Sequence, residues 1–438
     1  MAERRQPPAS LGFLMASWTR AHCVVPSGYD LNKPFSLVGW QLANAVDFYT
    51  VKAGTRFNAS RPLQGGAFQW RRGQIVGGQK LGKSPFGAAV ACFEAVGPCV
   101  FCGWAEGGEE FRCEDWGCGC GFSYEYRPGD PMGMPRRTAL VQLLANSEEQ
   151  TANVYRPLQT MVRNGHLDDL MKVCEGFIRL PNGGRIDPVT ASARSKLGNP
   201  VNFALCDESG VYTKRSGMFE VADTVLRGVT GMDGRMLELT NPWDPMDASF
   251  GQATYESPAT DIMKFFPRHD PKLDFTDKDD RRKILEFVYR GSPWVNLDAI
   301  EATCEELLPR DPAQARRFFG CELVQGLGSY MPEALYDDGI DERPYPADDT
   351  EICLGSTVPS PATGRRFAPR PWAATGSHPS TAWTGGRRIG IRSNGRDVSH
   401  AARSMPPFPT CSIISRSSDS TATLICGSRL SMIGVFVS

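Results

Sequence analysis

The feature that most constrains the fold is a glycine-rich loop, GGQKLGKS, at residues 77–84. It fits the pattern G-x-x-x-x-G-K-[S/T], whose glycines let consecutive backbone N–H groups turn toward phosphate oxygens. Lys83 would bring a cation to the β- and γ-phosphates, and Ser84 would offer a hydroxyl to Mg²⁺. Strand-like runs at 68–70 and 74–76 precede the loop, and a helical run at 86–93 follows it. The predicted nucleotide-binding residues are Gly77, Gly78, Gln79, Lys80, Leu81, Gly82, Lys83 and Ser84.

A second motif supplies acidic partners for the loop. Residues 201–206, VNFALC, are mostly apolar, which is typical of a buried parallel strand, and they end at Asp207 and Glu208. An Asp at the carboxyl end of such a strand can hold the Mg²⁺ water shell, and the adjacent Glu can polarise an attacking water. By itself the pair describes an ordinary strand end, and the loop alone an ordinary turn. Together they predict a nucleoside triphosphatase with Lys83, Asp207 and Glu208 as catalytic residues.

The strands around these motifs predict the architecture. Strands are expected at 138–145 and 235–239, a hairpin at 176–189, and a helix over 146–164 with a break at Pro157. Strands that alternate with helices predict an α/β fold, a doubly wound and mostly parallel sheet with flanking helices. Thr240 and Asn241 follow the 235–239 strand, where polar side chains would sense the γ-phosphate and couple hydrolysis to motion.

Composition divides the chain into parts. The 438 residues suffice for two or three domains, and the net charge of −1 argues neither for nor against a nucleic-acid partner. The sequence has no run of 18 apolar residues and no signal-peptide core, so we expect a cytosolic protein without a membrane span. Residues 351–438 contain 10 Arg, three acidic residues and no Lys, Tyr or Gln. We predict a nucleotide-hydrolysing domain at 1–257, a small helical linker or lid at 258–350 and an irregular, basic tail at 351–438.

The first domain carries a cysteine-rich insertion at about 97–130. The 14 cysteines of a cytosolic protein are thiols or metal ligands rather than disulfides. A Cys-x-x-Cys pair with further cysteines close behind is similar to a small zinc ribbon, although the last spacing, Cys-x-Cys, is not the usual pair. The alternative is a glycine-rich β-hairpin with free thiols. The candidate zinc ligands are Cys99, Cys102, Cys113, Cys118 and Cys120.

Two further candidates rest on single residues. The amide of Gln41 could read the adenine edge with Trp40 stacked nearby, whereas the simpler expectation is a core Trp40 and a surface Gln41. Arg194 could serve as an arginine finger, and the alternative is a surface arginine.

The motifs occur in an order that resembles the large terminase subunit of tailed bacteriophages, particularly phages of actinobacteria. The resemblance covers about residues 30–345, and the glycine-rich loop alone would indicate only a nucleotide hydrolase. The matching stretches are Pro34–Gln41, Arg71–Ser84, Gln142–Tyr155, Ile186–Lys196, Phe203–Glu208, Leu237–Pro245 and Asp311–Phe319.

The resemblance implies a P-loop ATPase of the ASCE type that pumps double-stranded viral DNA into a procapsid. It implies ATP and Mg²⁺ as cofactors, with Ser84 and Asp207 holding the metal, Glu208 as the catalytic carboxylate and Gln41 at the adenine. Thr240 and Asn241 would form the coupling motif. The expected partners are the portal protein and the small terminase subunit, and the expected assembly is a homo-oligomeric ring on the portal in the host cytoplasm during phage assembly.

The family's pattern stops near residue 355. A ribonuclease-H-like nuclease domain should follow, with an Asp just past Ile352–Gly355, but the next residues are STVPS. Two-metal cleavage needs a cluster of carboxylates, so nuclease activity is doubtful in this chain. We hypothesise a frameshift, because a G+C-rich gene read out of frame gives Arg, Pro, Ser, Gly, Thr and Ala without Lys or Tyr. The alternative is a disordered basic tail that binds DNA.

Two other functions remain open at this point. One is another nucleic-acid translocase, such as a helicase-like ATPase. The other is a zinc-bearing binding module whose degenerate nucleotide site does not hydrolyse, although the presence of both Lys83 and Glu208 argues against it.

Overall fold

A computed structural model describes residues 8–191 and 199–326 and five short strands beyond residue 350. The chain divides into two compact units, Met1–Glu333 and Ala334–Ser438. Within the described residues, no helix combines the length and the apolar character that a membrane crossing requires.

The first unit is built on an eight-stranded sheet. The first six strands across the sheet run parallel to one another, and the last two pair antiparallel at one edge. This mostly parallel α/β architecture confirms the predicted fold class. In spatial order the strands are β12 (Ile262–Phe265), β1 (Arg72–Val76), β11 (Arg235–Thr240), β10 (Phe203–Asp207), β6 (Leu140–Leu144), β9 (Arg185–Val189), β8 (Phe177–Arg179) and β7 (Lys172–Cys174).

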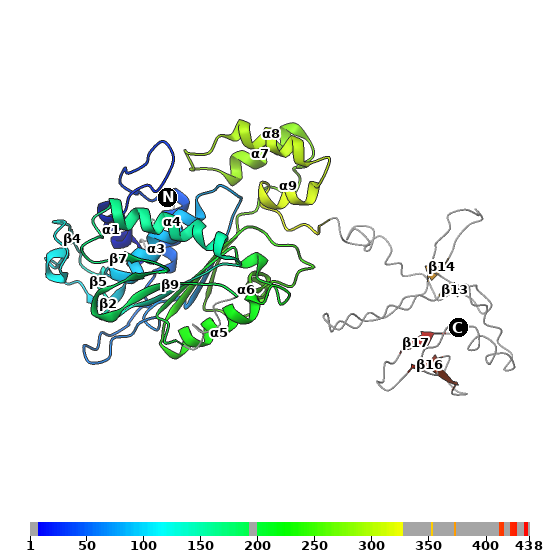
Figure 1. Cartoon of the computed structure of the whole chain (residues 1–438), viewed down its shortest axis with the longest axis horizontal. Coiled ribbons are helices and arrows are strands. Elements are labelled where there is room, and N and C mark those ends of the chain that lie inside the picture. The colour runs from blue at the N-terminus through cyan, green and yellow to red at the C-terminus, as the bar shows by residue number, and fades with distance from the viewer. Residues whose placement is uncertain are drawn as a thin grey trace, which may run out of the picture. The chain divides into compact units, whose positions relative to one another are not determined.

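Helices cover both faces of this sheet, as Figure 1 shows for α3 and α4 on one side and α5 and α6 on the other. In β10, Phe203 and Leu205 pack into the core on the first face, and Ala204 and Cys206 pack into the core on the second. A strand buried on both sides reads as a continuous apolar run, which is why the sequence revealed it. The helices are α1 (Gly12–His22), α2 (Gly39–Phe48), α3 (Lys83–Val96) and α4 (Glu148–Asn164) on one face, and α5 (Met218–Gly231) and α6 (Phe250–Glu256) on the other.

Local differences from the sequence prediction are few. Helix α4 continues through Pro157, so the expected break is wrong. Phe68 forms only an isolated bridge with Val51, and the strand before the loop is β1 alone. The hairpin expected at 176–189 is confirmed as the antiparallel pair β8–β9.

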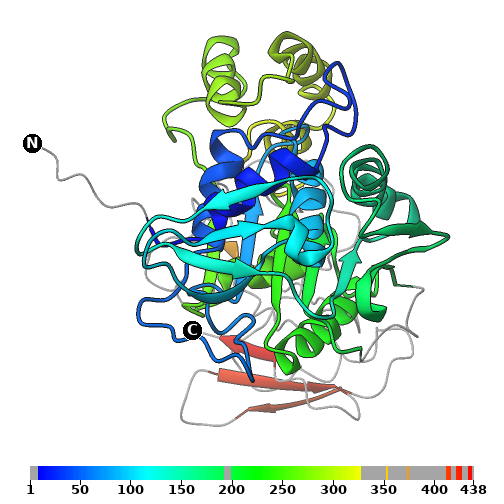
Figure 2. The same ribbon diagram turned by 90° about the vertical axis from the view of Figure 1, so that its left-hand side faces the viewer.

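The insertion after α3 consists of two antiparallel pairs. Strand β2 (Val100–Trp104) pairs with β5 (Pro131–Met134), and β3 (Glu110–Arg112) pairs with β4 (Ser123–Glu125). Figure 2 shows these strands in cyan. The insertion is therefore built of β strands, and three of its cysteines, Cys113, Cys118 and Cys120, lie in the turn between β3 and β4.

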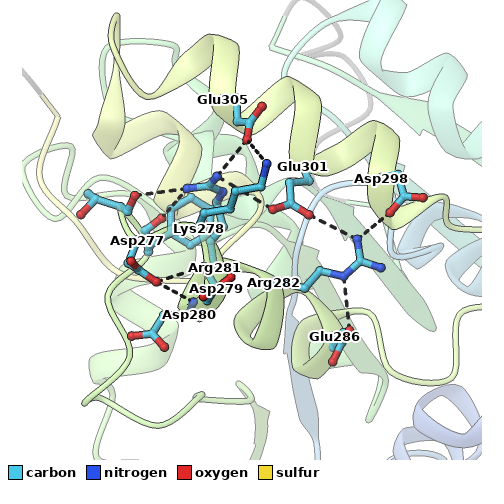
Figure 3. Close-up of polar contacts among 12 residues, drawn as sticks. Asp277, Lys278, Asp279, Asp280, Arg281, Arg282, Glu286, Asp298, Glu301 and Glu305 are labelled. Carbon is cyan, nitrogen blue, oxygen red and sulfur yellow. Dashed lines mark hydrogen bonds and ion pairs between the residues drawn. The ribbon is translucent and has the colours of Figure 1, made fainter.

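The predicted helical linker contains α7 (Lys278–Val288), α8 (Leu297–Leu307) and α9 (Pro312–Phe318). These helices have their own apolar core, which also takes in Leu81 of the glycine-rich loop. Ion pairs join α7 to α8, as Figure 3 shows: Arg281 lies near Glu301 and Glu305, and Arg282 pairs with Asp298 and Glu301.

In the second unit the described residues are short strands only. Strand β13 (Ile352–Cys353) pairs with β14 (Trp372–Ala373), and β15 (Cys411–Ser415), β16 (Thr421–Cys426) and β17 (Ile433–Phe436) form a second antiparallel sheet. The rest of the predicted basic tail, including the residues that directly follow Gly355, lies outside the described residues, so the frameshift hypothesis stays a prediction.

Candidate nucleotide site

The glycine-rich loop joins the carboxyl end of β1 to the N-terminus of α3, as predicted. Gly82 precedes the helix with a φ of 94°, a left-handed conformation that strains any residue with a Cβ. A Cβ at Gly82 would also lie 2.6 Å from the ring of Trp294. The loop therefore needs glycine at this point, and the helix N-terminus behind it favours a bound anion.

The ammonium of Lys83 is held inside the loop. Its Nζ donates to the carbonyl oxygens of Gly77 at 3.0 Å and Gly78 at 2.8 Å, and to Oδ1 of Asn241 at 2.8 Å. Burial lowers the pKa of Lys83, and the nearby Glu208 opposes the shift. The loop thus holds the Lys83 ammonium in a position where phosphate oxygens could replace the two carbonyl oxygens as its hydrogen-bond acceptors.

Ser84 and Asp207 meet on the other side of the loop. The Ser84 hydroxyl lies 3.3 Å and 3.5 Å from the two carboxyl oxygens of Asp207. Burial, and next the charge of Glu208, raise the pKa of Asp207 to about 7, while Lys83 and Ser84 act against the rise. A hydroxyl and a carboxylate are hard oxygen donors of the kind that Mg²⁺ prefers. These two residues therefore fit the predicted metal-holding role.

Asn241 links the two halves of the site. Strand β11 lies between β1 and β10 in the sheet, so its end lies between the loop and the acidic pair. The amide Nδ2 of Asn241 donates to both carboxylate oxygens of Glu208 at 2.9 Å, and its backbone N–H donates to Oε2 at 3.1 Å. Its Oδ1 accepts from Lys83. One side chain thus contacts the cation and the carboxylate that the sequence motifs singled out.

Glu208 itself has a strained backbone. Its φ is 60° and its ψ is 46°, a left-handed conformation that non-glycine residues rarely adopt. Its N–H donates to the carbonyl of Leu239 at 2.6 Å, and the hydroxyl of Thr240 accepts from the N–H of Gly210 at 2.9 Å. The end of β11 therefore holds the turn after β10, and with it the direction of the Glu208 side chain.

Gln41 is buried rather than exposed, so the expectation of a surface Gln41 is wrong. Helix α2 begins at Gly39, and Oε1 of Gln41 turns back to accept from the N–H of Val38 at 3.1 Å. This hydrogen bond caps the helix and explains the burial. Trp40 packs edge-on against Phe86 of α3, with 5.6 Å between ring centroids, which puts this segment next to the helix that follows the loop.

The sequence analysis missed the contacts of the helical linker with the loop. The N–H of Gln79 donates to the carbonyl of Phe318 at 2.7 Å, and the hydroxyl of Tyr289 donates to the carbonyl of Gln79 at 2.7 Å. The indole N–H of Trp294 donates to the carbonyl of Lys80 at 3.2 Å. All three bonds use a backbone carbonyl and join residues more than 200 positions apart, so no local sequence pattern predicts them.

The remaining candidates are Arg194 and the five cysteines of the insertion. Arg194 lies outside the described residues. Among the described residues, Cys113, Cys118 and Cys120 converge with His22, which the sequence analysis did not name. Cys99 and Cys102 are not members of that cluster, and the Cys99 thiol instead lies 3.6 Å from the carbonyl of Glu94, so the structure does not bring these two candidate ligands to the other three cysteines.

Sequence comparisons give distant relatives from mycobacteriophages. No family model matches the chain. The Gene 13 protein of Mycobacterium phage L5 is 24% identical over 253 residues, which cover 55% of this chain and 39% of the relative. The Gene 13 protein of Mycobacterium phage D29 is 23% identical over 263 residues, covering 57% of this chain and 41% of the relative. The chain thus spans about two fifths of the length of these curated relatives.

Structure comparison identifies the architecture. The large terminase of bacteriophage HK97 superposes with a TM-score of 0.50 at 14% sequence identity, and the match covers 80% of this chain and 60% of the HK97 chain. At this identity the likeness concerns the fold. The chain has the fold of a bacteriophage large terminase, as its ordered sequence motifs predicted.

Proposed function

We propose that this chain is the ATP-hydrolysing motor of a tailed-phage terminase and that it translocates double-stranded viral DNA into a procapsid. The observation that carries the proposal is the position of Asn241, which hydrogen-bonds both Lys83 and Glu208. A nucleotide site linked to the end of a central strand in this way is suited to coupling hydrolysis to movement. The terminase fold and the order of the motifs support the assignment to DNA packaging.

The residues divide the work of hydrolysis among them. Lys83 would exchange its contacts with the loop carbonyls for phosphate oxygens, and Ser84 with Asp207 would hold the metal ion. Bound Mg²⁺ would neutralise charge on the phosphates. Glu208 would orient the attacking water and accept its proton. Gln41 would contact the adenine base, and Arg194 would act as an arginine finger.

The segment after Asn241 offers a route from the site to the helical linker. The carboxylate of Asp244 pairs with Arg317 of α9 at 3.2 Å and accepts from the N–H of Gly326 at 2.8 Å. A change in the contacts of Asn241 would therefore act on a segment tied to α9. This connection supports the coupling role proposed for Thr240 and Asn241.

The proposed partners follow from the packaging role. They are duplex DNA held mainly through its backbone, the portal protein, the small terminase subunit and further copies of this chain in a ring, in the host cytoplasm. A working nuclease is left out of the proposal, because residues 351–438 hold three acidic residues and two-metal cleavage needs more carboxylates.

A packaging assay tests the proposal against its alternatives. Empty procapsids carrying the portal are mixed with the chain, the small subunit, ATP and linear duplex DNA, and nuclease-protected DNA is measured. Protection that requires ATP and is lost in Glu208→Gln is the expected result. Unwinding of a forked duplex without any protection would instead identify a helicase. Failure to release phosphate from ATP under all conditions would identify a non-hydrolysing binding module.

A further inference from the structure

Four side chains from distant parts of the sequence converge between α1 and the insertion. Nε2 of His22 lies 3.2 Å from Sγ of Cys113 and 3.1 Å from Sγ of Cys120, although 91 and 98 residues separate them in the chain. With Sγ of Cys118, all four ligand atoms lie within 4.8 Å of one another. His22, Cys113 and Cys118 are buried and Cys120 is half-buried.

The imidazole is oriented as a metal ligand would be. Nδ1 of His22 lies 2.8 Å from the carbonyl oxygen of Trp18, and because a carbonyl only accepts, Nδ1 carries the proton. The lone pair is then on Nε2, which faces the sulfurs. The indole of Trp18 stacks on the ring at 4.4 Å and Phe122 meets it edge-on at 5.4 Å. A carbonyl partner on the distal nitrogen is the arrangement that fixes metal-bound histidines.

The loop that carries the cysteines is shaped around their sulfurs. A single 3₁₀ turn, Cys113–Trp116, ends at Gly117 with a φ of 83°, and the N–H of Cys118 then returns to the carbonyl of Cys113 at 3.2 Å. The N–H of Phe122 lies 3.4 Å from Sγ of Cys120. An amide that points at a sulfur stabilises a thiolate more than a thiol, because the thiolate is the stronger acceptor.

We propose that His22, Cys113, Cys118 and Cys120 bind one structural Zn²⁺ ion. Three thiolates and one imidazole form a closed tetrahedral set, which is typical of structural zinc and provides no open position for a substrate. A disulfide between two of the cysteines would not explain why the third thiol and the imidazole of His22 converge on the same point. The sequence suggested a zinc ribbon within the insertion, whereas these four ligands join the insertion to a helix of the core.

The site would hold three segments at one point. Helix α1 is anchored in the main core through Leu14, Met15 and Trp18. The insertion supplies the cysteines, and the loop after α4 joins through the N–H of His166, which donates to the carbonyl of His22 at 3.1 Å. The zinc ion therefore fixes the insertion against the ATPase core and is separate from the nucleotide site.

Metal analysis of the full chain is the direct test. The chain is expressed with zinc, dialysed and measured by elemental mass spectrometry, and about one zinc per chain is expected. The double variant Cys113→Ser/Cys118→Ser should lose that zinc, while the matched control Cys102→Ser, from the same insertion, should keep it. His22→Cys, which retains four ligands, should keep zinc, and His22→Ala should release it to a weak chelator.

Thiol titration of the wild type keeps the test decisive if the double variant fails to fold. Three cysteines should be protected from a thiol reagent in the folded chain and become reactive when a strong chelator removes the metal. Cobalt bound in place of zinc should give the visible bands of a tetrahedral, thiolate-rich site. A chain that is metal-free with these thiols reactive, a disulfide among Cys113, Cys118 and Cys120, or zinc retained by the folded double variant would each overturn the proposal. The ATPase proposal does not depend on this outcome.

Discussion

Asn241 is the residue on which the candidate site depends most. Its amide gives an acceptor to Lys83 and two donor contacts to Glu208, so it holds a cation and a carboxylate at fixed positions before nucleotide arrives. The hydrogen bond between Lys83 and Asn241 can break when the Lys83 ammonium binds a phosphate group instead. The strained backbone of Glu208 is consistent with a side chain held in one orientation by its neighbours.

Replacing Asn241 should separate binding from hydrolysis. In Asn241→Ala, Glu208 keeps only the backbone N–H of residue 241, so the attacking water is poorly oriented. We expect ATP hydrolysis to fall by roughly tenfold or more, but by less than the about 10²–10⁴-fold that a positioned base contributes, because Glu208 itself remains. Binding of a fluorescent ATP analogue should change by less than about threefold, because the loop contacts remain.

Asn241→Asp is the matched charge control. Its shape is nearly that of asparagine, but a carboxylate facing Glu208 repels it, so hydrolysis should fall further than in Asn241→Ala. Wild-type hydrolysis in both variants would contradict the role given to this side chain.

At the scale of elements, the helical linker lies directly on the nucleotide loop. The indole of Trp294 donates to Lys80, and its ring occupies the space where a Cβ of residue 82 would be. The carbonyl of Phe318 accepts a hydrogen bond from the N–H of Gln79, which is one of the loop donors that could otherwise bind a phosphate oxygen. Nucleotide binding and the position of α7–α9 are therefore expected to affect each other.

Trp294 should report nucleotide binding by its fluorescence. ATP entering the loop changes the surroundings of the indole, so intrinsic fluorescence should change on titration with ATP and Mg²⁺. Most of that change should be absent in Trp294→Phe, while Trp116→Phe, an exposed tryptophan of the insertion, should retain it. If Trp294→Phe shows the full wild-type change, the linker does not respond to nucleotide at this contact.

The α7–α8 pair offers a stability test with an internal control. The side chain of Arg281 is 3% exposed and donates to the carbonyl of Thr276 at 3.2 Å, whereas that of Arg282 is 38% exposed. Removing the buried guanidinium takes a donor from the buried carbonyl of Phe275, 3.4 Å from Nη1, so Arg281→Ala should lower the free energy of unfolding by about 3 kcal/mol. Arg282→Ala removes ion pairs of a solvent-accessible guanidinium and should cost clearly less than Arg281→Ala. Urea unfolding followed by circular dichroism compares them, and equal losses would contradict this assignment.

At the scale of the whole molecule, the sequence predicted the features that depend on residues close to one another in the chain. Apolar runs buried on both faces, as in β10, predicted the central strands, and the glycine-rich loop predicted where the candidate nucleotide site lies. Contacts between distant segments were not predictable. His22 gives no pattern with cysteines 91 residues later. Gln41 was missed for a different, local reason: its side chain caps its own helix, but Val38 at the N-cap is not one of the residues that usually mark a helix start.

The frameshift hypothesis makes a prediction about the gene. Resequencing the coding DNA around codon 355 and translating all three frames should reveal another frame that resumes with an Asp-containing strand after Gly355. That frame should remain open for the length of a domain. If no other frame stays open, the basic tail is genuine and DNA cutting would need another protein.

Steady-state ATP hydrolysis tests the central claim most directly. Phosphate release would be measured with Mg²⁺, with and without linear duplex DNA, for the wild type, Lys83→Ala and Glu208→Gln. The account predicts turnover by the wild type, loss of ATP binding and turnover in Lys83→Ala, and retained ATP binding with turnover lowered by about 10²-fold or more in Glu208→Gln. Turnover that survives in Glu208→Gln at the wild-type rate would contradict it, because the site built around Asn241 would then not be where ATP is hydrolysed.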